Sequence, residues 1–155
     1  YLVDLEDPRW SPARASSFLS KGSLYGAEIE WESWLSRSLS AGIWGRLSNS
    51  ENDETDGCDV PYIPRLTGQA RLDYLGRSGL RVGLTLSHTG QRYADRDNTV
   101  RLGSYSLLNL RAEKQFDPQN MLFVDVQNLT DKEYEYWQGY PGRSRTVRVG
   151  FEMRF

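Results

Sequence analysis

The side chains that most often carry out chemistry are few in this sequence, and they are not arranged for catalysis. The single histidine, His88, has no second metal ligand at a usual spacing. Neither a Gly-x-Ser-x-Gly elbow nor a glycine-rich phosphate loop occurs. The sequence therefore predicts no catalytic residue, no metal site and no cofactor, and we expect that the protein is not an enzyme.

An acidic run from Glu51 to Asp59 is the segment whose chemistry best suits a cation, because calcium prefers carboxylate and carbonyl oxygens. Its central stretch, residues 52–57, lacks the spacing of a calcium-binding EF-hand loop. We expect a solvated loop, with calcium binding as the alternative. Cys58 lies in the same run and is the only cysteine, so it cannot form an internal disulfide.

Composition narrows the class of protein. The 21 acidic and 19 basic residues nearly cancel, so there is no basic field for nucleic acid. Hydrophobic residues make up only 38% of the chain, while aromatic residues reach 12%. That balance suits a protein with one apolar and one polar face. The first residues, 1–4, read like the middle of a strand, so we expect a fragment or a processed chain.

Side chains alternate between apolar and polar along seven segments, which is the period of two that is typical of β-strands. The predicted strands lie near residues 25–35, 39–48, 66–74, 80–93, 105–116, 121–128 and 144–155, and residues 1–4 are predicted to end an eighth. In the last segment, Val147, Val149, Phe151, Met153 and Phe155 share one face, opposite Arg148, Gly150, Glu152 and Arg154.

The connections between these strands alternate between short and long. The short ones are residues 36–38, 76–79 and 117–120, and the long ones are about 5–22, 49–64, 94–104 and 129–143. Alternate connections of an up-and-down meander lie at the same end, so one end of the sheet should carry only short turns and the other only long loops. This asymmetry is typical of outer-membrane barrels. The strands are also long enough to cross a bilayer when tilted.

Aromatic residues gather toward both ends of the predicted strands. They are Tyr74, Phe116 and Phe155 near the short turns, and Tyr25, Tyr62, Tyr93 and Tyr105 near the long loops. Two such girdles at the lipid–water boundaries are typical of membrane barrels. A soluble β-sandwich with tyrosines at its strand ends is the alternative interpretation.

Short motifs in the last third of the chain carry a more specific signal. The segment Asn128-Leu129-Thr130-Asp131-Lys132-Glu133-Tyr134 resembles the N-L-x-D-x-x-Y stretch of TonB-dependent outer-membrane receptors. The segment Gly139-Tyr140-Pro141-Gly142-Arg143 resembles their G-Y-P-x-P-G-R stretch, one or two residues shorter here. Further resemblances occur in order at residues 26–30, 62–65 and 103–110, so the likeness runs from about residue 22 onward.

The residues of these motifs also have a local interpretation. Asn128 and Asp131 can bond the nearby backbone and close a turn where a strand ends. Pro141 and Gly142 can turn the chain into the last strand, and Arg143 can lie at the rim. A purely structural role is the main expectation for Asn128, Asp131 and Arg143, and direct ligand contact is the alternative.

The resemblance implies an all-β, antiparallel, up-and-down transmembrane barrel of 22 strands with an N-terminal plug in its lumen. Residues 1–155 would form its C-terminal section of about 7–8 strands, with the plug and the earlier strands absent. It also implies a receptor in the outer membrane of a Gram-negative bacterium. Such receptors take up a scarce ligand, for example a ferric siderophore in iron uptake, haem or cobalamin.

The same resemblance implies the partners. Uptake would be energised through TonB, which would act on the missing N-terminal region. Outer-membrane lipid would surround the barrel, and the barrel-assembly machinery would read the terminal strand, with Phe155 as the assembly signal. Ligand contact is expected in the last external loop, from Tyr136, Trp137 and Tyr140, whose rings can stack on a conjugated ligand. Anchoring at the membrane boundary is the alternative for these rings.

Two other interpretations stay open at this point. The chain can be a small autonomous outer-membrane β-barrel that serves as a structural anchor or adhesin. It can also be a soluble β-sandwich binding module.

Overall fold

A computed structural model describes residues 22–53 and 57–154, and all their regular structure is β. The strands are β1 (Gly22–Ser36), β2 (Leu39–Asn52), β3 (Leu66–Leu75), β4 (Leu80–Thr89), β5 (Arg92–Tyr93), β6 (Arg101–Leu102), β7 (Tyr105–Gln115), β8 (Asn120–Gln127), β9 (Glu135–Trp137), β10 (Tyr140–Pro141) and β11 (Thr146–Met153). Within these residues, no helix is long and apolar enough to cross a membrane.

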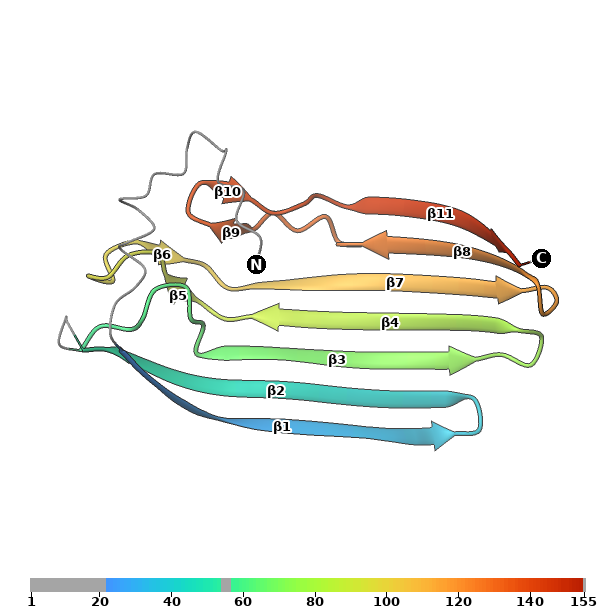
Figure 1. Cartoon of the computed structure of the whole chain (residues 1–155), viewed down its shortest axis with the longest axis horizontal. Helices are drawn as coiled ribbons and strands as arrows, with labels where there is room; N and C mark the ends of the chain where they lie inside the picture. Colours follow the sequence, from blue (N-terminus) through green and yellow to red (C-terminus); the bar gives the residue numbers. More distant parts are fainter. Residues whose placement is uncertain (1–21, 54–56, 155) are drawn as a thin grey trace.

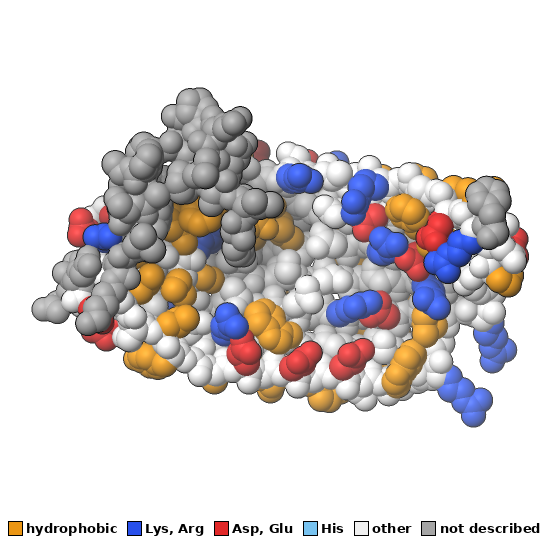
Figure 2. Space-filling model, in the orientation of Figure 1, with side chains coloured by type: hydrophobic (Ala, Val, Ile, Leu, Met, Phe, Trp, Pro, Cys, Tyr) orange, Lys and Arg blue, Asp and Glu red, His pale blue; other side chains and the backbone are white. Residues whose placement is uncertain are grey.

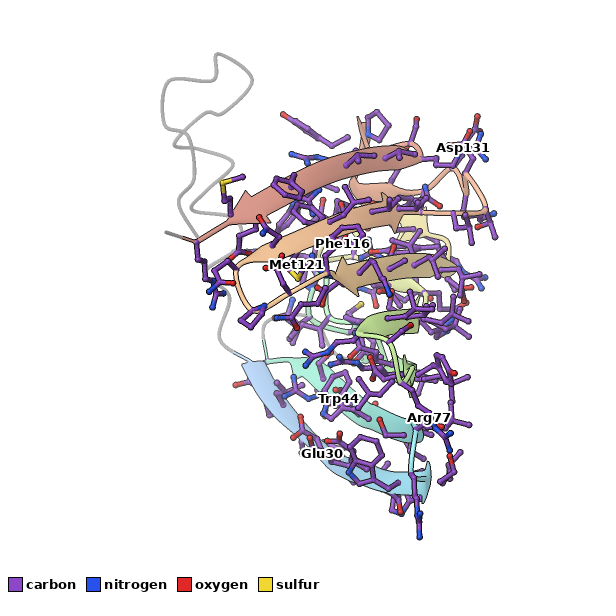
Figure 3. All side chains as sticks on the ribbon, turned by 90° about the vertical axis from the view of Figure 1, so that its right-hand side faces the viewer. Glu30, Trp44, Arg77, Phe116, Met121 and Asp131 are labelled. Atoms are coloured by element: carbon purple, nitrogen blue, oxygen red, sulfur yellow. The ribbon has the colours of Figure 1, made fainter. Side chains whose placement is uncertain are left out.

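Seven of the strands form one antiparallel sheet in the order β1-β2-β3-β4-β7-β8-β11 (Figure 1). Every strand pairs with the one before it in the sheet, which is the predicted up-and-down meander. The other four strands form two short ladders, β5 with β6 and β9 with β10, inside long connections. Seen from the end with the short turns, the sheet is curved, as a section of a barrel is (Figure 3). In the part of the chain that the structure describes, β1 and β11 are the edge strands, and the outer side of each has no pairing strand.

The predicted asymmetry of the connections is confirmed. The links between β1 and β2, β3 and β4, and β7 and β8 are tight turns that share one end of the sheet (Figure 1). In the last of these turns, Asp117 accepts hydrogen bonds from the backbone of Gln119 and Asn120. The long connections, which carry the two small ladders, lie at the opposite end.

One face of the sheet is apolar and exposed. Ile29, Leu47 and Val149 are 63%, 61% and 67% exposed, although each lies within a regular strand. The buried hydrophobic residues of the described chain are only Ala94, Leu102 and Tyr105, all at the end with the long connections. A soluble sandwich would bury its apolar face against a second sheet. The exposed face therefore fits lipid as its solvent.

The opposite face carries acidic and basic side chains in mixed rows (Figure 2). Arg46 on β2 bonds Glu28 directly across on β1. Asp125 on β8 lies between two arginines of the neighbouring strands, 2.9 Å from Arg148 and 3.8 Å from Arg111. Such cross-strand pairs offset the cost of placing charge inside a barrel wall.

A glycine in the last strand makes room for an aromatic ring on this polar face. A Cβ at Gly150 would lie 2.4 Å from the Phe123 ring, so only glycine fits beneath it. The Arg111 guanidinium covers the same ring, 5.0 Å from its centroid. The alternation of the terminal strand is therefore confirmed in detail for residues 146–153.

Several predicted boundaries are wrong. The fourth strand ends at Thr89 rather than Tyr93, because the amide of Gly90 donates to the Leu66 carbonyl and the chain then leaves the sheet. The first two strands run past the predicted ends, because their pairing continues from Trp34 and Ser40 as far as Gly22 and Asn52. The predicted strand at residues 1–4 lies outside the described residues.

The predicted aromatic girdle at the end with the long loops is only partly right. Tyr25 is 61% exposed in the apolar register of β1. Tyr105, in contrast, is buried at the polar face, because it pairs with Thr89 and lies in register with Arg111. Tyr62 packs on Trp137 within the loops. The side-chain period of two places Tyr105 away from the lipid face.

Asp125, which two arginines share, should contribute more to the stability of the barrel than an exposed ion pair does. Asp125→Asn leaves Arg148 without its carboxylate, and we expect a loss of about 2 kcal/mol in the free energy of unfolding of the complete barrel. The matched control is Glu152→Gln, whose pair with Arg154 is far more exposed, and its effect should be close to zero. Heat-dependent gel mobility of both variants measures the difference, and equal melting temperatures would contradict this role for Asp125.

Candidate functional site

Three long connections meet at one end of the sheet and form the candidate site. They are residues 57–65, 90–104 and 128–145 in the described chain. Two of them contain the short ladders β5–β6 and β9–β10, which lie beyond the ends of the main strands (Figure 1). Residues far apart in sequence therefore come together here.

Asn128 holds the entry to the last of these connections. Its side chain is buried, with 3% exposed, and its backbone has a φ of 51°. The side-chain amide donates to the carbonyls of Lys132 and Arg143 at 2.9 and 3.0 Å, and its oxygen accepts from the Lys132 amide at 2.8 Å. The Asn128 amide donates to the side chain of Asn109 on β7. One side chain thus joins the end of β8 to the segment that leads into β11.

Asp131 and Leu129 complete this turn. Asp131 has a φ of 54°, and its carboxylate accepts a hydrogen bond of 2.7 Å from the Arg145 amide. The Leu129 amide donates to the Leu108 carbonyl on β7 at 2.7 Å. These contacts bind backbone groups, as expected for residues that close a turn.

The second motif forms the β9–β10 hairpin and its return. Gly139 has a φ of 76°, which a residue with a side chain adopts only with strain. The Gly142 amide donates to the Tyr134 carbonyl at 2.7 Å. A Cβ at Gly142 would lie 2.1 Å from the Tyr134 ring, so the ring lies directly on this glycine. Pro141 is in the edge ladder opposite Glu135, and Arg143 is exposed at the rim.

Aromatic rings from two of the connections and from the start of β7 form a cluster at this end. The ring centroids of Tyr134 and Tyr105 are 4.5 Å apart, and those of Tyr134 and Tyr136 are 5.5 Å apart. Tyr62 packs on Trp137 at 4.3 Å. Burial, with smaller contributions from Tyr136 and Tyr105, raises the pKa of the Tyr134 phenol. The phenol therefore stays neutral at physiological pH.

Arg92 lies beside this cluster, and the sequence analysis did not single it out. It is 5% exposed, and its guanidinium lies 5.5 Å from the centroid of the Tyr105 ring. Its Nη2 donates to the carbonyls of Glu135 and Tyr136 at 2.8 and 2.9 Å. No motif or spacing marks Arg92 in the sequence, because its partners are backbone groups more than 40 residues away.

The other two connections are joined by Asn98 and Asp59. The Asn98 side chain accepts from the Asp59 amide at 2.7 Å and donates to the Asp59 carbonyl at 3.0 Å. Asp59 also receives two hydrogen bonds from Arg65, at 3.1 and 3.2 Å. This bond to Asp59 raises the pKa of the Arg65 guanidinium. Asp59 therefore has a structural partner rather than an open coordination site.

Asp95 shapes the tip of the connection between β5 and β6. Desolvation favours its neutral form, but hydrogen bonds from Thr99 and from the Val100 amide outweigh it and lower the pKa of the carboxyl group. The ionised carboxylate thus stabilises this turn. Asn98, with a φ of 54°, lies within the turn and is held there in position to reach Asp59.

The predicted ligand-contact residues are brought together in the β9–β10 hairpin. Tyr136 and Trp137 are 55% and 48% exposed, while Tyr140 is half-buried and pairs with Trp137. A cleft of about 270 Å³ lies between residues 101–105 and 132–135 beside the cluster. Phe155 and residues 54–56 of the acidic run lie outside the described residues. In the described ranges, no group of three acidic, histidine or cysteine residues could hold a metal ion.

Comparison with known proteins identifies a protein family that matches most of this chain. Residues 3–129 match the family model described as TonB dependent receptor-like, beta-barrel. The ferric yersiniabactin uptake receptor FyuA from Yersinia pestis is 26% identical, with a TM-score of 0.72 over 88% of this chain and 24% of that one. The siderophore receptor PiuA from Acinetobacter baumannii is 15% identical, with a TM-score of 0.75 over 86% of this chain and 22% of that one.

The copper transporter OprC shares the same fold. It is 17% identical, with a TM-score of 0.71 over 86% of this chain and 24% of that one. The chain therefore spans about a quarter of the length of these solved structures.

The contacts of Asn128 predict its role in stability. Asn128→Ala removes the side-chain partners of Lys132 and Arg143 and keeps a positive φ, so we expect a loss of about 3 kcal/mol in the free energy of unfolding of the complete barrel. Asn128→Gly relieves the backbone strain but not the lost hydrogen bonds, so it should recover about 1 kcal/mol. Thermal unfolding of both variants measures this, and wild-type stability of Asn128→Ala would contradict it.

Proposed function

This chain belongs to the TonB-dependent receptor-like β-barrel family, and we propose that it is the C-terminal section of a receptor for uptake of a ferric siderophore. Members of the family reside in the outer membrane of Gram-negative bacteria and are transporters rather than enzymes. The observation that carries the proposal is the seven-stranded sheet. One of its faces is apolar and the other charged, and long loops joined by hydrogen bonds lie at one end only.

The two open edges of this sheet bear on how much of the receptor this chain forms. We propose that residues 1–155 form one section of the barrel, and that β1 and β11 pair with strands from the rest of the receptor. A plug inside the barrel would face the charged side, and TonB would act on a segment ahead of that plug. Phe155 is proposed as the terminal residue that the barrel-assembly machinery reads.

The two alternative interpretations explain less of the molecule. A soluble sandwich needs a buried apolar face, but Ile29, Leu47 and Val149 are all exposed. A small autonomous barrel of eight strands needs a closed sheet, whereas the sheet of the described residues is open, with β1 and β11 at opposite edges. We therefore propose neither.

The choice of cargo draws on the relatives and on the hairpin. FyuA is a ferric yersiniabactin uptake receptor and PiuA is a siderophore receptor, whereas OprC is a copper transporter. The described loops provide aromatic rings rather than a group of metal-ligating side chains. Aromatic rings favour a large conjugated ligand over a bare metal ion. We propose Tyr136, Trp137 and Tyr140 as its contact residues.

A binding experiment on the complete receptor tests this function. Wild-type receptor should bind ferric yersiniabactin, and Trp137→Ala or Tyr136→Ala should weaken binding about tenfold. The matched control is Phe116→Ala, which removes an equally exposed ring at the other end of the sheet and should leave affinity unchanged. Quenching of intrinsic fluorescence by the ferric complex provides the measurement.

Two outcomes would contradict the proposal. If the two loop variants bind as tightly as wild type, the hairpin is not the contact site. If the receptor binds Cu²⁺ but no ferric siderophore from a panel that includes ferric yersiniabactin and a ferric tris-catecholate, the class of cargo is wrong.

A further inference from the structure

Arg92 is a buried arginine for which no ion pair occurs among the described residues. The residue is 5% exposed, and its Nη1 is buried without a hydrogen-bond partner. A buried charge that lacks a counter-ion lowers stability rather than raising it. The position of Arg92 therefore needs a reason other than the stability of the fold.

The bonds that Arg92 makes converge on one short element. Its Nη2 reaches the carbonyls of Glu135 and Tyr136, two successive residues of β9. Its other side packs on the Tyr105 ring at the start of β7, and its backbone pairs with Leu102 in the β5–β6 ladder. Arg92 thus connects β9 both to the barrel wall and to the neighbouring connection.

The β9–β10 hairpin is a small sheet separate from the seven-stranded one. Its ladder has two residue pairs with an irregular register, and a two-stranded hairpin alone is marginally stable in water. Other contacts of the hairpin include the bond from the Gly142 amide to the Tyr134 carbonyl and the packing of the Tyr136 ring on Tyr134 and Tyr105 and of Trp137 on Tyr62. Arg92 differs from these contacts because its side chain bonds the backbone of β9 itself, the strand that carries the exposed rings of Tyr136 and Trp137.

We propose that Arg92 is a positioning residue, which fixes the β9–β10 hairpin so that Tyr136 and Trp137 present their rings to the ligand. This inference rests on the function proposed above. Arginine suits the role better than lysine, because its planar guanidinium can bond two carbonyls and stack on an aromatic ring at the same time. Arg92 acts through the hairpin and does not itself contact the ligand.

Hydrogen exchange of the complete receptor, without any ligand, tests whether Arg92 holds the β9–β10 hairpin in place. Arg92→Met keeps the side-chain length but removes every side-chain donor, and the amides of residues 136–140 and 142 should then exchange at least about tenfold faster. Arg92→Lys should restore part of the protection. Amides of β8 provide the internal reference and should not change. Unchanged exchange in the hairpin of Arg92→Met would overturn the proposal.

A second measurement separates positioning from a merely structural role. Because Arg92→Met removes an unpaired buried charge, the melting temperature of the barrel should stay the same or rise. Affinity for ferric yersiniabactin should nevertheless fall about tenfold. In a double-mutant cycle, the losses of affinity from Arg92→Met and Trp137→Ala should be less than additive, because Arg92 acts in part through the Trp137 ring. Full additivity, or a loss of affinity that only follows a lower melting temperature, would overturn the proposal.

The matched control is Arg65→Gln. Arg65 is also a loop arginine, but its guanidinium bonds the Asp59 carboxylate rather than the carbonyls of the hairpin. It should change neither hairpin exchange nor affinity. If Trp137→Ala leaves affinity intact, the proposed function fails, and hairpin exchange alone then decides whether Arg92 positions the hairpin. If Trp137→Ala weakens binding but Arg92→Met does not, only the role of Arg92 fails.

Discussion

The pairing of every strand with its neighbour is the constraint on which this structure depends. Where one face of a sheet meets lipid, water cannot satisfy the backbone amides and carbonyls, so adjacent strands must do so. Antiparallel pairing with a side-chain period of two then sends alternate residues outward and inward. Ile29 and Val149 face lipid, while Glu28 and Arg148 face the interior. The same constraint requires partners for the outer edges of β1 and β11, which we propose are strands from the rest of the receptor.

A wall built in this way has no hydrophobic core of its own, so order at its loop end comes from polar contacts. Asn128 joins β8 to the segment before β11, and Asn98 joins two neighbouring connections through Asp59. Arg92 adds the hairpin that carries Tyr136 and Trp137. These side chains bond mainly to backbone groups. The shape of the loops therefore depends on a few polar residues more than on the other side chains around them.

The alternation of side chains predicted the strands and the tight turns, because both are local properties of the sequence. It did not predict that the fourth strand ends at Thr89, since that depends on Gly90 bonding Leu66 on another strand. It assigned Tyr105 to a lipid-facing girdle, although the register of β7 turns that ring inward. Arg92 was missed for the same reason: its role comes from contacts between connections, which no short pattern records.

The central claim is that the apolar face of this sheet meets lipid. It can be tested directly by nitroxide labels at each position from Val147 to Met153 except Gly150, in the complete receptor in bilayers with Cys58 replaced by serine. Labels at Val147, Val149, Phe151 and Met153 should be accessible to oxygen, and labels at Arg148 and Glu152 to a water-soluble relaxation agent. Equal accessibility of both sets to the water-soluble agent would contradict the account.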